Sequence, residues 1–222
     1  MSHSVKIKIA IFFIALVIFG AIFMSWGLDD IGGLLAHPAR AALLVLLLTQ
    51  LIVFGWFIPL GWMQSRLPKQ STENNMLIAF IGAMGVLLFL MISPFSDRNE
   101  WMQLGGGSDV WRYVGLFLFT IGAFLSIWAS VHMCQSFKNK QNYQLITDGP
   151  FQLVRHPRDL GTILVFIGIP LVFLSSLGLL LAFLSSAGLF ERIGREERML
   201  EQQFKEEWLE YAQHTKCLIP WV

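Results

Sequence analysis

Residues 160–190, LGTILVFIGIPLVFLSSLGLLLAFLSSAGLF, form a long apolar stretch that decides the fold of the C-terminal half. As a single helix it would be about 46 Å long, well beyond the roughly 30 Å hydrocarbon core of a bilayer. Pro170, the pair Ser175 and Ser176, and Gly178 fall near its middle, where they favour a turn. We therefore expect two short helices that form a membrane hairpin.

The composition of the whole chain also indicates a membrane protein. Hydrophobic residues make up 55% of the 222 residues and charged residues 14%, against roughly 25% charged residues in soluble domains. The mean hydropathy is +0.60 and the net charge is only +1. These values exclude a soluble globular enzyme, a disordered chain and a nucleic-acid-binding protein. Two cysteines, Cys134 and Cys217, are too few for a disulfide framework.

Four further apolar stretches are long enough to cross a bilayer as helices. They comprise residues 9–26, 39–60, 76–94 and 111–133. No small-residue cleavage site follows the first stretch, so we expect an anchor rather than a signal peptide. The sequence thus predicts an all-α polytopic membrane helix bundle with about six transmembrane helices, including the C-terminal hairpin, plus a cytoplasmic amphipathic C-terminal helix.

The distribution of Lys and Arg predicts that both termini are cytoplasmic. With six crossings, thirteen of the 16 basic residues fall in cytoplasmic segments and three, Arg40, Arg98 and Arg112, fall outside. With five crossings, the 16 basic residues would be divided equally between the two sides of the membrane. The hairpin returns the chain to the side that it left, so the polar stretches 134–159 and 191–222 become neighbours. The spans carry almost no ionisable residues, which argues against a transporter or a channel.

The first polar stretch contains a loop suited to an anion. Residues 148–150, Asp-Gly-Pro, are typical of a turn, and Pro157 suits the first turn of a following helix. A helix N-terminus attracts anions, and Arg155 and Arg158 flank this one. We expect a carboxylate or phosphate site here. The alternative is that both arginines only follow the preference of basic residues for the cytoplasmic side.

The second polar stretch, residues 191–211, has the pattern of an amphipathic helix. Apolar residues recur at positions 193, 200, 204, 208 and 211, and Glu197 occupies the missing position of this stripe. A carboxylate on a buried face needs a partner, so Glu197 either pairs with an arginine of the facing loop or binds a ligand. Glu196 lies about 100° round the helix, where water could solvate it.

The sequence supports neither a metal site nor a nucleophilic dyad. Histidines are scattered without ligand-spaced pairs, and neither cysteine belongs to an evident dyad.

The motifs of both polar stretches match one known pattern. The residues concerned are Gly149-Pro150-Phe151, Val154-Arg155-His156-Pro157 and Gly161, then, after the apolar hairpin, Arg195-Glu196-Glu197-Arg198-Met199-Leu200 with Phe204, Trp208, Tyr211 and Ile219-Pro220. With this spacing the chain resembles the isoprenylcysteine carboxyl methyltransferase family, part of a broader group with the membrane phospholipid methyltransferases. The family signature is Arg-His-Pro-x-Tyr, a hydrophobic stretch and Glu-Glu. The resemblance covers roughly residues 126–222, whereas residues 1–125 match only as generic spans.

The resemblance implies an integral membrane S-adenosylmethionine-dependent methyltransferase. It implies a lipophilic or small acceptor in the lipid bilayer, with a carboxylate, a thiol and an amine left open, and neither nucleic acid nor metal as a partner. The protein would lie in the inner membrane of a prokaryotic cell or the endoplasmic reticulum of a eukaryotic one. Residues 1–133 would form an N-terminal four-helix transmembrane region and residues 134–222 a cofactor-binding region.

Carried over residue by residue, the resemblance also implies a site. The expected catalytic residues are Arg155 and Glu197, and the expected cofactor-binding residues are Arg155, His156, Pro157, Asp159, Gly161, Glu196 and Glu197.

One of these positions departs from the family signature, because Asp159 stands where the signature has tyrosine. Its carboxylate could pair with the ammonium group of the cofactor, or the activity could be altered or lost. Two other functions therefore stay open at the level of sequence. One is a membrane reductase of related architecture that uses a nicotinamide dinucleotide, and the other is a non-catalytic membrane protein that retains the fold.

Overall fold

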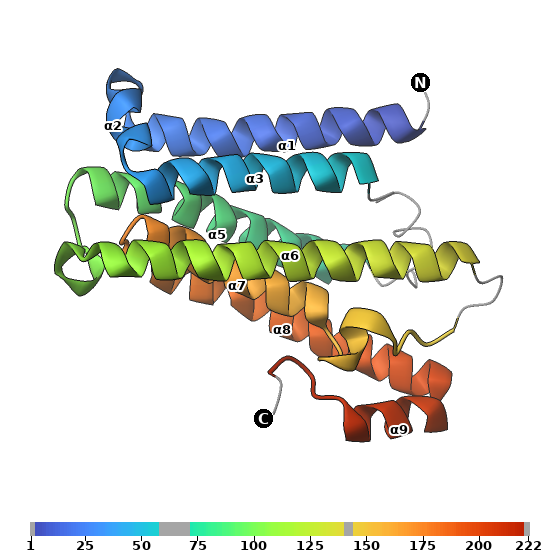
Figure 1. Ribbon diagram of the computed structural model, residues 1–222. Coiled ribbons are helices and arrows are strands. Elements are labelled where there is room, and N and C mark those ends of the chain that lie inside the picture. The colour runs from blue at the N-terminus through green and yellow to red at the C-terminus, as the bar shows by residue number, and fades with distance from the viewer. Residues whose placement is uncertain (1–2, 58–71, 140–143, 220–222) are drawn as a thin grey trace.

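The computed structural model describes residues 3–57, 72–139 and 144–219 (Figure 1). Residues 58–60 of the predicted second span and Pro220 of the family pattern lie outside these ranges. Six long helices run along a common axis within the described part of the chain (Figure 1). They are α1 (His3–Trp26), α3 (Pro38–Phe57), α5 (Thr72–Arg98), α6 (Asp109–Asn139), α7 (Pro157–Val172) and α8 (Ser176–Phe204). Short elements join or follow them: η1 (Leu28–Asp30), α2 (Ile31–Ala36), η2 (Leu104–Gly107), η3 (Gly149–Gln152) and α9 (Glu206–His214).

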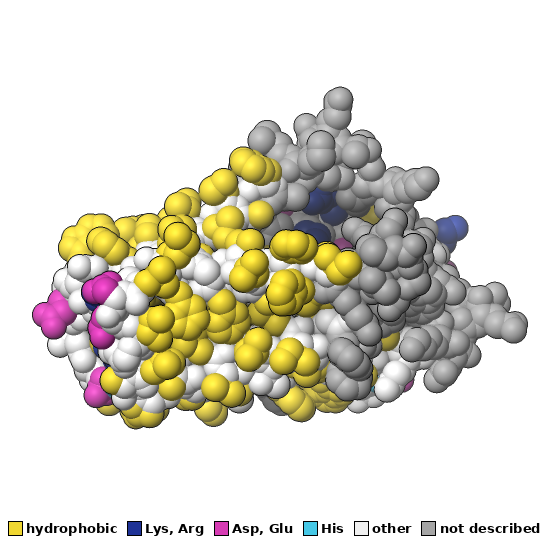
Figure 2. All heavy atoms as spheres, turned by 90° about the horizontal axis from the view of Figure 1, so that it is seen from above, with side chains coloured by type: hydrophobic (Ala, Val, Ile, Leu, Met, Phe, Trp, Pro, Cys, Tyr) yellow, Lys and Arg dark blue, Asp and Glu magenta, His cyan; other side chains and the backbone are white. Residues whose placement is uncertain are grey.

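The predicted all-α membrane bundle is confirmed. Among the described residues, four helices are long and apolar enough to cross a bilayer, over Ile9–Trp26, Pro38–Gly55, Asp109–Ser136 and Ser176–Phe204. Figure 2 shows hydrophobic side chains along one face of the molecule, with acidic side chains gathered at one end. Helices α5 and α7 lie alongside the other four (Figure 1), but the number of crossings, six by sequence, stays a prediction.

The predicted hairpin is confirmed, with α7 and α8 packed against each other and a tight turn between them. The turn passes through Leu174, which has a positive φ of 49°, and the Ser175 side chain accepts a hydrogen bond of 2.9 Å from the backbone N–H of Gly178. This serine therefore caps the N-terminus of α8. The sequence suggested two short helices, but the second is long: α8 spans 29 residues and continues into the polar stretch.

The amphipathic C-terminal helix is α9, and it is shorter than the helix expected over residues 191–211. The chain breaks at Lys205, which has a φ of 46° and separates α8 from α9. The apolar stripe is consequently divided between two helices, with Ile193 buried on α8 and Trp208 buried on α9. The break lets α9 fold back toward the loop before α7 (Figure 1).

Glycines bring α6 and α7 into close contact. A Cβ atom on Gly161 would lie 2.5 Å from the carbonyl oxygen of Gly122, and one on Gly168 would lie 2.7 Å from that of Gly115. Small residues at such positions let two membrane helices approach through their backbones. This seam fixes the start of α7, and with it the polar loop that precedes α7, against α6.

At the opposite end of the bundle, the three arginines predicted to lie outside all form ion pairs. Asp97, whose side chain is 1% exposed, lies 3.1 Å from Arg40 and 2.6 Å from Arg112. Arg98 pairs with Asp29 at 2.5 Å. Their positive charge is therefore balanced locally.

Candidate active site

Three polar segments meet at the end of the bundle where α6 ends (Figure 1). They are the loop before α7, the polar half of α8 and the segment that follows α9. The backbone N–H groups of Arg155 and His156 donate to the carbonyl oxygens of Lys216 and Cys217, at 2.8 Å and 3.2 Å. These hydrogen bonds hold the segment after α9 along the loop. The two polar stretches are therefore neighbours, as the hairpin predicted.

Tyr211 of α9 also binds the loop before α7. Its hydroxyl donates a hydrogen bond of 2.6 Å to the carbonyl oxygen of Phe151. Burial raises the pKa of the Tyr211 phenol above its ordinary value, so the hydroxyl remains a donor at neutral pH.

Arg155 joins all three segments. Its Nε and Nη2 atoms each lie 2.8 Å from Oε1 of Glu197 on α8. Its Nη1 donates to the carbonyl oxygens of Ala212 and Thr215, at 3.0 Å and 2.7 Å. The guanidinium also lies 5.6 Å from the ring centroid of Trp208, a cation–π distance. The ion pair between Glu197 and an arginine of the facing loop, one of the two alternatives left open by the sequence, is therefore present.

His156 lies between two carboxylates at the N-cap of α7. The residue is only 5% exposed, and its Nε2 is 3.3 Å from Oε1 of Glu197. Its Nδ1 is 3.9 Å from Oδ2 of Asp159, one turn further along α7. The imidazole thus connects the start of α7 to α8.

Asp159, at the family's tyrosine position, is also engaged across the hairpin. It is 2% exposed and forms an ion pair with Arg192 of α8. A buried carboxylate at this position is stabilised by that cation, which explains how the fold accommodates the departure from the family signature.

Glu196, Pro157 and Gly161 complete the set predicted from the sequence. The carboxylate of Glu196 lies within 4.8 Å of a ring nitrogen of His156 and of the Asp159 carboxylate, so Glu196 faces the site rather than bulk water. Pro157 is buried at the first position of α7, as predicted. Gly161 faces α6, where the close helix contact accounts for the glycine.

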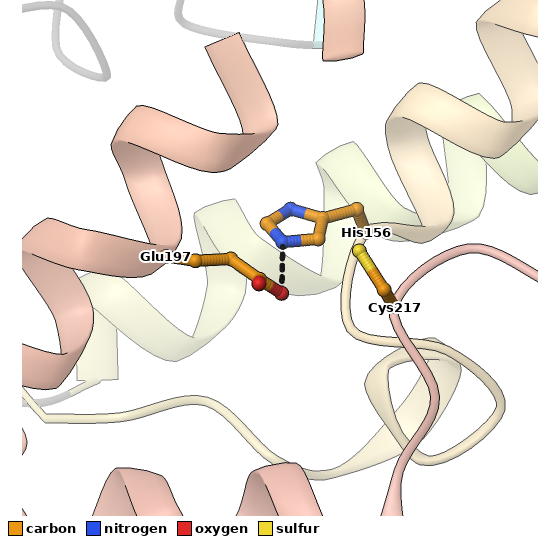
Figure 3. Close-up of side chains that lie close together, drawn as sticks. All are labelled: His156, Glu197 and Cys217. Atoms are coloured by element: carbon orange, nitrogen blue, oxygen red, sulfur yellow. Dashed lines mark hydrogen bonds and ion pairs between the residues drawn. The ribbon is translucent and has the colours of Figure 1, made fainter. Parts of the chain in front are cut away.

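Sequence reasoning missed Cys217 and Arg192. The thiol of Cys217 lies within 4.8 Å of both Glu197 and His156, and Figure 3 shows the three side chains gathered from different segments. Burial and the neighbouring Glu197 raise the pKa of the Cys217 thiol. No periodicity links position 217 to position 197, because the turn after α9 creates the contact. Arg192 was counted only as a basic residue near the membrane.

Comparison with known proteins gives the family. The profile of the family described as phospholipid methyltransferase matches residues 110–207, which include Arg155 and Glu197. A probable protein-S-isoprenylcysteine O-methyltransferase from Oryza sativa subsp. indica is 31% identical over 165 residues, 69% of this chain and 83% of that protein. The chain belongs to the isoprenylcysteine carboxyl methyltransferase family. Protein-S-isoprenylcysteine O-methyltransferase B from Arabidopsis thaliana is 28% identical over 144 residues, 61% of this chain and 73% of that protein.

Family membership and the apolar helices together make this protein a membrane methyltransferase. The methyltransferase motifs are those that the structure brings together, since both halves of the signature contribute to the cluster of Arg155, His156 and Glu197.

Proposed function

We propose that this methyltransferase transfers the methyl group of S-adenosylmethionine to a lipophilic acceptor that reaches the site from the membrane. Among a carboxylate, a thiol and an amine, the names of the relatives favour the carboxylate of an isoprenylated cysteine. The observation that carries the proposal is the Arg155–Glu197 pair, which joins both halves of the family signature at the polar end of an apolar bundle.

The charges in the site fit the groups of S-adenosylmethionine. Arg155 and His156 both contact Oε1 of Glu197. Glu197 Oε2 and the Glu196 carboxylate suit the ammonium or the ribose hydroxyls of the cofactor. The start of α7 suits its carboxylate, because a helix N-terminus favours negative charge.

Arg155 and Asp159 act mainly by positioning in this proposal. The guanidinium of Arg155 already donates to Glu197, Ala212 and Thr215, so it holds the segments of the site together. The carboxylate of Asp159 holds Arg192 instead of the cofactor ammonium. His156 contacts Glu197 at 3.3 Å and so helps to orient that carboxylate, while Asp159 lies 3.9 Å from its other ring nitrogen.

Methyl transfer to a carboxylate does not require a general acid or base. S-adenosylmethionine supplies an electrophilic methyl group, and an ionised carboxylate acceptor needs no proton removed. The protein then contributes by aligning the acceptor with the methyl group and by excluding water, which can account for a large share of a rate enhancement. Residues 134–222 would supply the cofactor-binding region and residues 1–133 the membrane scaffold.

We also propose that this polar end, with both termini, is cytoplasmic, in the inner membrane of a prokaryote or the endoplasmic reticulum of a eukaryote. The ion pairs of Arg40, Arg98 and Arg112 support this orientation, since they balance the basic charge at the other end. Part of the basic charge counted as cytoplasmic falls in residues 58–71 and 140–143, outside the described residues. Reporter fusions after Gly106 and after the last residue should read outside and inside, respectively.

Calorimetric titration of the detergent-solubilised protein with S-adenosylmethionine and with NADPH tests the cofactor. We expect saturable binding of the first and none of the second. Transfer of a labelled methyl group to a farnesylated cysteine with a free carboxylate, but not to its methyl ester, tests the acceptor. Binding of NADPH alone would contradict the proposal, and labelling of both compounds would contradict the assignment of the carboxylate.

A further inference from the structure

Glu197, the partner of Arg155, lies close to two other side chains that can bind metal ions. His156 comes from the start of α7, Glu197 from α8 and Cys217 from the segment after α9 (Figure 3). Their ligand atoms all lie within 4.8 Å of one another, and His156 Nε2 is 3.3 Å from Glu197 Oε1. Two ligand atoms at about 2.0–2.1 Å from one tetrahedral metal ion are themselves roughly 3.3 Å apart. His156 and Glu197 therefore already have the spacing of two ligands of one ion, and the Cys217 thiol lies within 4.8 Å of both.

We propose that His156, Glu197 and Cys217 form a site for a zinc-like divalent ion. One nitrogen, one oxygen and one sulfur ligand make a borderline-soft set that suits Zn²⁺ better than Mg²⁺ or Ca²⁺. Three protein ligands leave the fourth tetrahedral position for water or another small ligand. Cys217 lies beyond residues 110–207, the part of the chain that matches the family profile.

Arg155 should lower the affinity of this site for a metal ion. Its guanidinium already neutralises Glu197 through Oε1, at 2.8 Å, and would repel a second cation nearby. Hydrogen bonds from Nη1 to Ala212 and Thr215 can hold Arg155 while Glu197 turns toward the ion. The zinc ion would thus compete with Arg155 for Glu197, and we expect a reversible site that is weaker than a structural zinc site.

A second group around the same histidine is a poorer candidate. It consists of His156, Asp159 and Glu196, again with ligand atoms within 4.8 Å of one another. Asp159 in that group is already paired with Arg192, and the group lacks sulfur. Cys217 therefore distinguishes the two groups.

Proton release is a further consequence. A thiol must lose its proton to become a thiolate ligand, so binding of the ion releases a proton. Affinity should rise about tenfold per pH unit while the thiol is protonated in the free protein. The inference rests on the proposed function in one respect only: if Glu197 also binds the cofactor, zinc and S-adenosylmethionine exclude each other.

Binding of Co²⁺ to the purified protein in detergent, without cofactor, tests the site. We expect one ion per chain, a thiolate-to-cobalt charge-transfer band and displacement by Zn²⁺. Cys217→Ser should abolish the band and weaken binding at least tenfold, and Glu197→Gln should also weaken it. The control is Cys134→Ser, at the other cysteine, which should bind as the parent does.

Alkylation provides a second measurement that needs no variant. Bound Zn²⁺ should protect Cys217 from iodoacetamide, as measured by mass spectrometry of the peptide. Absence of protection and of a charge-transfer band at saturating ion would overturn the proposal, and so would unchanged Co²⁺ binding in Cys217→Ser. Zinc binding without any binding of S-adenosylmethionine would overturn the proposed function while leaving the metal site intact.

Discussion

Two nitrogens of Arg155 lie 2.8 Å from a single carboxylate oxygen of Glu197, although 42 residues separate the two side chains. The whole apolar hairpin lies between them in the sequence. The pair therefore closes the hairpin at its polar end and places the two halves of the family signature in one cluster. Because Arg155 also donates to carbonyl oxygens within α9 and just after it, loss of either partner should disturb both the site and the C-terminal segment.

Glu197→Gln should weaken binding of S-adenosylmethionine about ten- to a hundredfold, equivalent to about 1.5–3 kcal/mol. The change keeps the shape of the side chain but leaves Arg155 without its counter-charge. Titration calorimetry on variants with equal helicity would measure it. Glu196→Gln should have a smaller effect, because Glu196 makes no ion pair with Arg155 in the described structure. The reverse order of effects would mean that Glu196 is the main ligand.

Arg155→Lys should impair cofactor binding although it keeps the positive charge. One ammonium group cannot replace the planar guanidinium, which reaches Glu197, Ala212 and Thr215 together. We expect an affinity loss of about tenfold or more, measured by calorimetry. Arg158→Gln is the control near in sequence and should bind nearly normally. Equal, mild losses in both variants would show that these arginines only orient the protein in the membrane.

Asp159→Asn should destabilise the protein by leaving Arg192 without its carboxylate partner. Removing one member of a buried ion pair can cost about 3–5 kcal/mol, and the partly exposed Arg192 places this pair toward or below the lower end of that range. The double variant Asp159→Asn/Arg192→Gln should recover part of the loss. Melting temperatures in detergent would give the coupling. Additive effects of the two changes would refute an interaction between these side chains.

Alkylation of Cys217 should be slow at neutral pH and accelerate at unusually high pH. Burial and Glu197 favour the neutral thiol in the folded protein and raise its pKa. The associated stability is present below the ordinary thiol pKa and is lost as the pH rises through the raised value. Rates of iodoacetamide labelling against pH would measure the shift. Glu197→Gln should lower the apparent pKa, and an unchanged profile would mean that burial alone causes the shift.

Gly161→Ala should destabilise the bundle by about 1–3 kcal/mol through overpacking. The added methyl group would lie 2.5 Å from the carbonyl oxygen of Gly122, so α6 and α7 would have to separate. Gly188→Ala is the matched control, because a Cβ atom there meets nothing within 4 Å. Thermal unfolding in detergent should leave the control unchanged or slightly stabilised. Equal melting temperatures for both variants would show that the seam tolerates extra volume.

Sequence alone determined the membrane character, the helical class and the hairpin. Several apolar stretches in one short chain are long enough to cross a bilayer, and the serine pair marked where the longest of them turns. Pro170, also expected near the turn, lies inside α7. The stripe through Ile193 and Trp208 also indicated that Glu197 faces inward, because side-chain direction in a helix follows directly from spacing. The same local reasoning identified Arg155 and His156 beside the start of α7.

Tertiary structure decided which partners these residues meet. Lys205, with a positive φ, ends α8 and sends α9 back over the loop, and the segment after α9 then brings Cys217 close to Glu197. Packing of α7 on α8 gave Asp159 its partner Arg192 and brought Glu196 close to His156. Spacing along one helix fixes directions within that helix. Contacts between separate segments depend on turns and on side-chain packing, which no period in the sequence records.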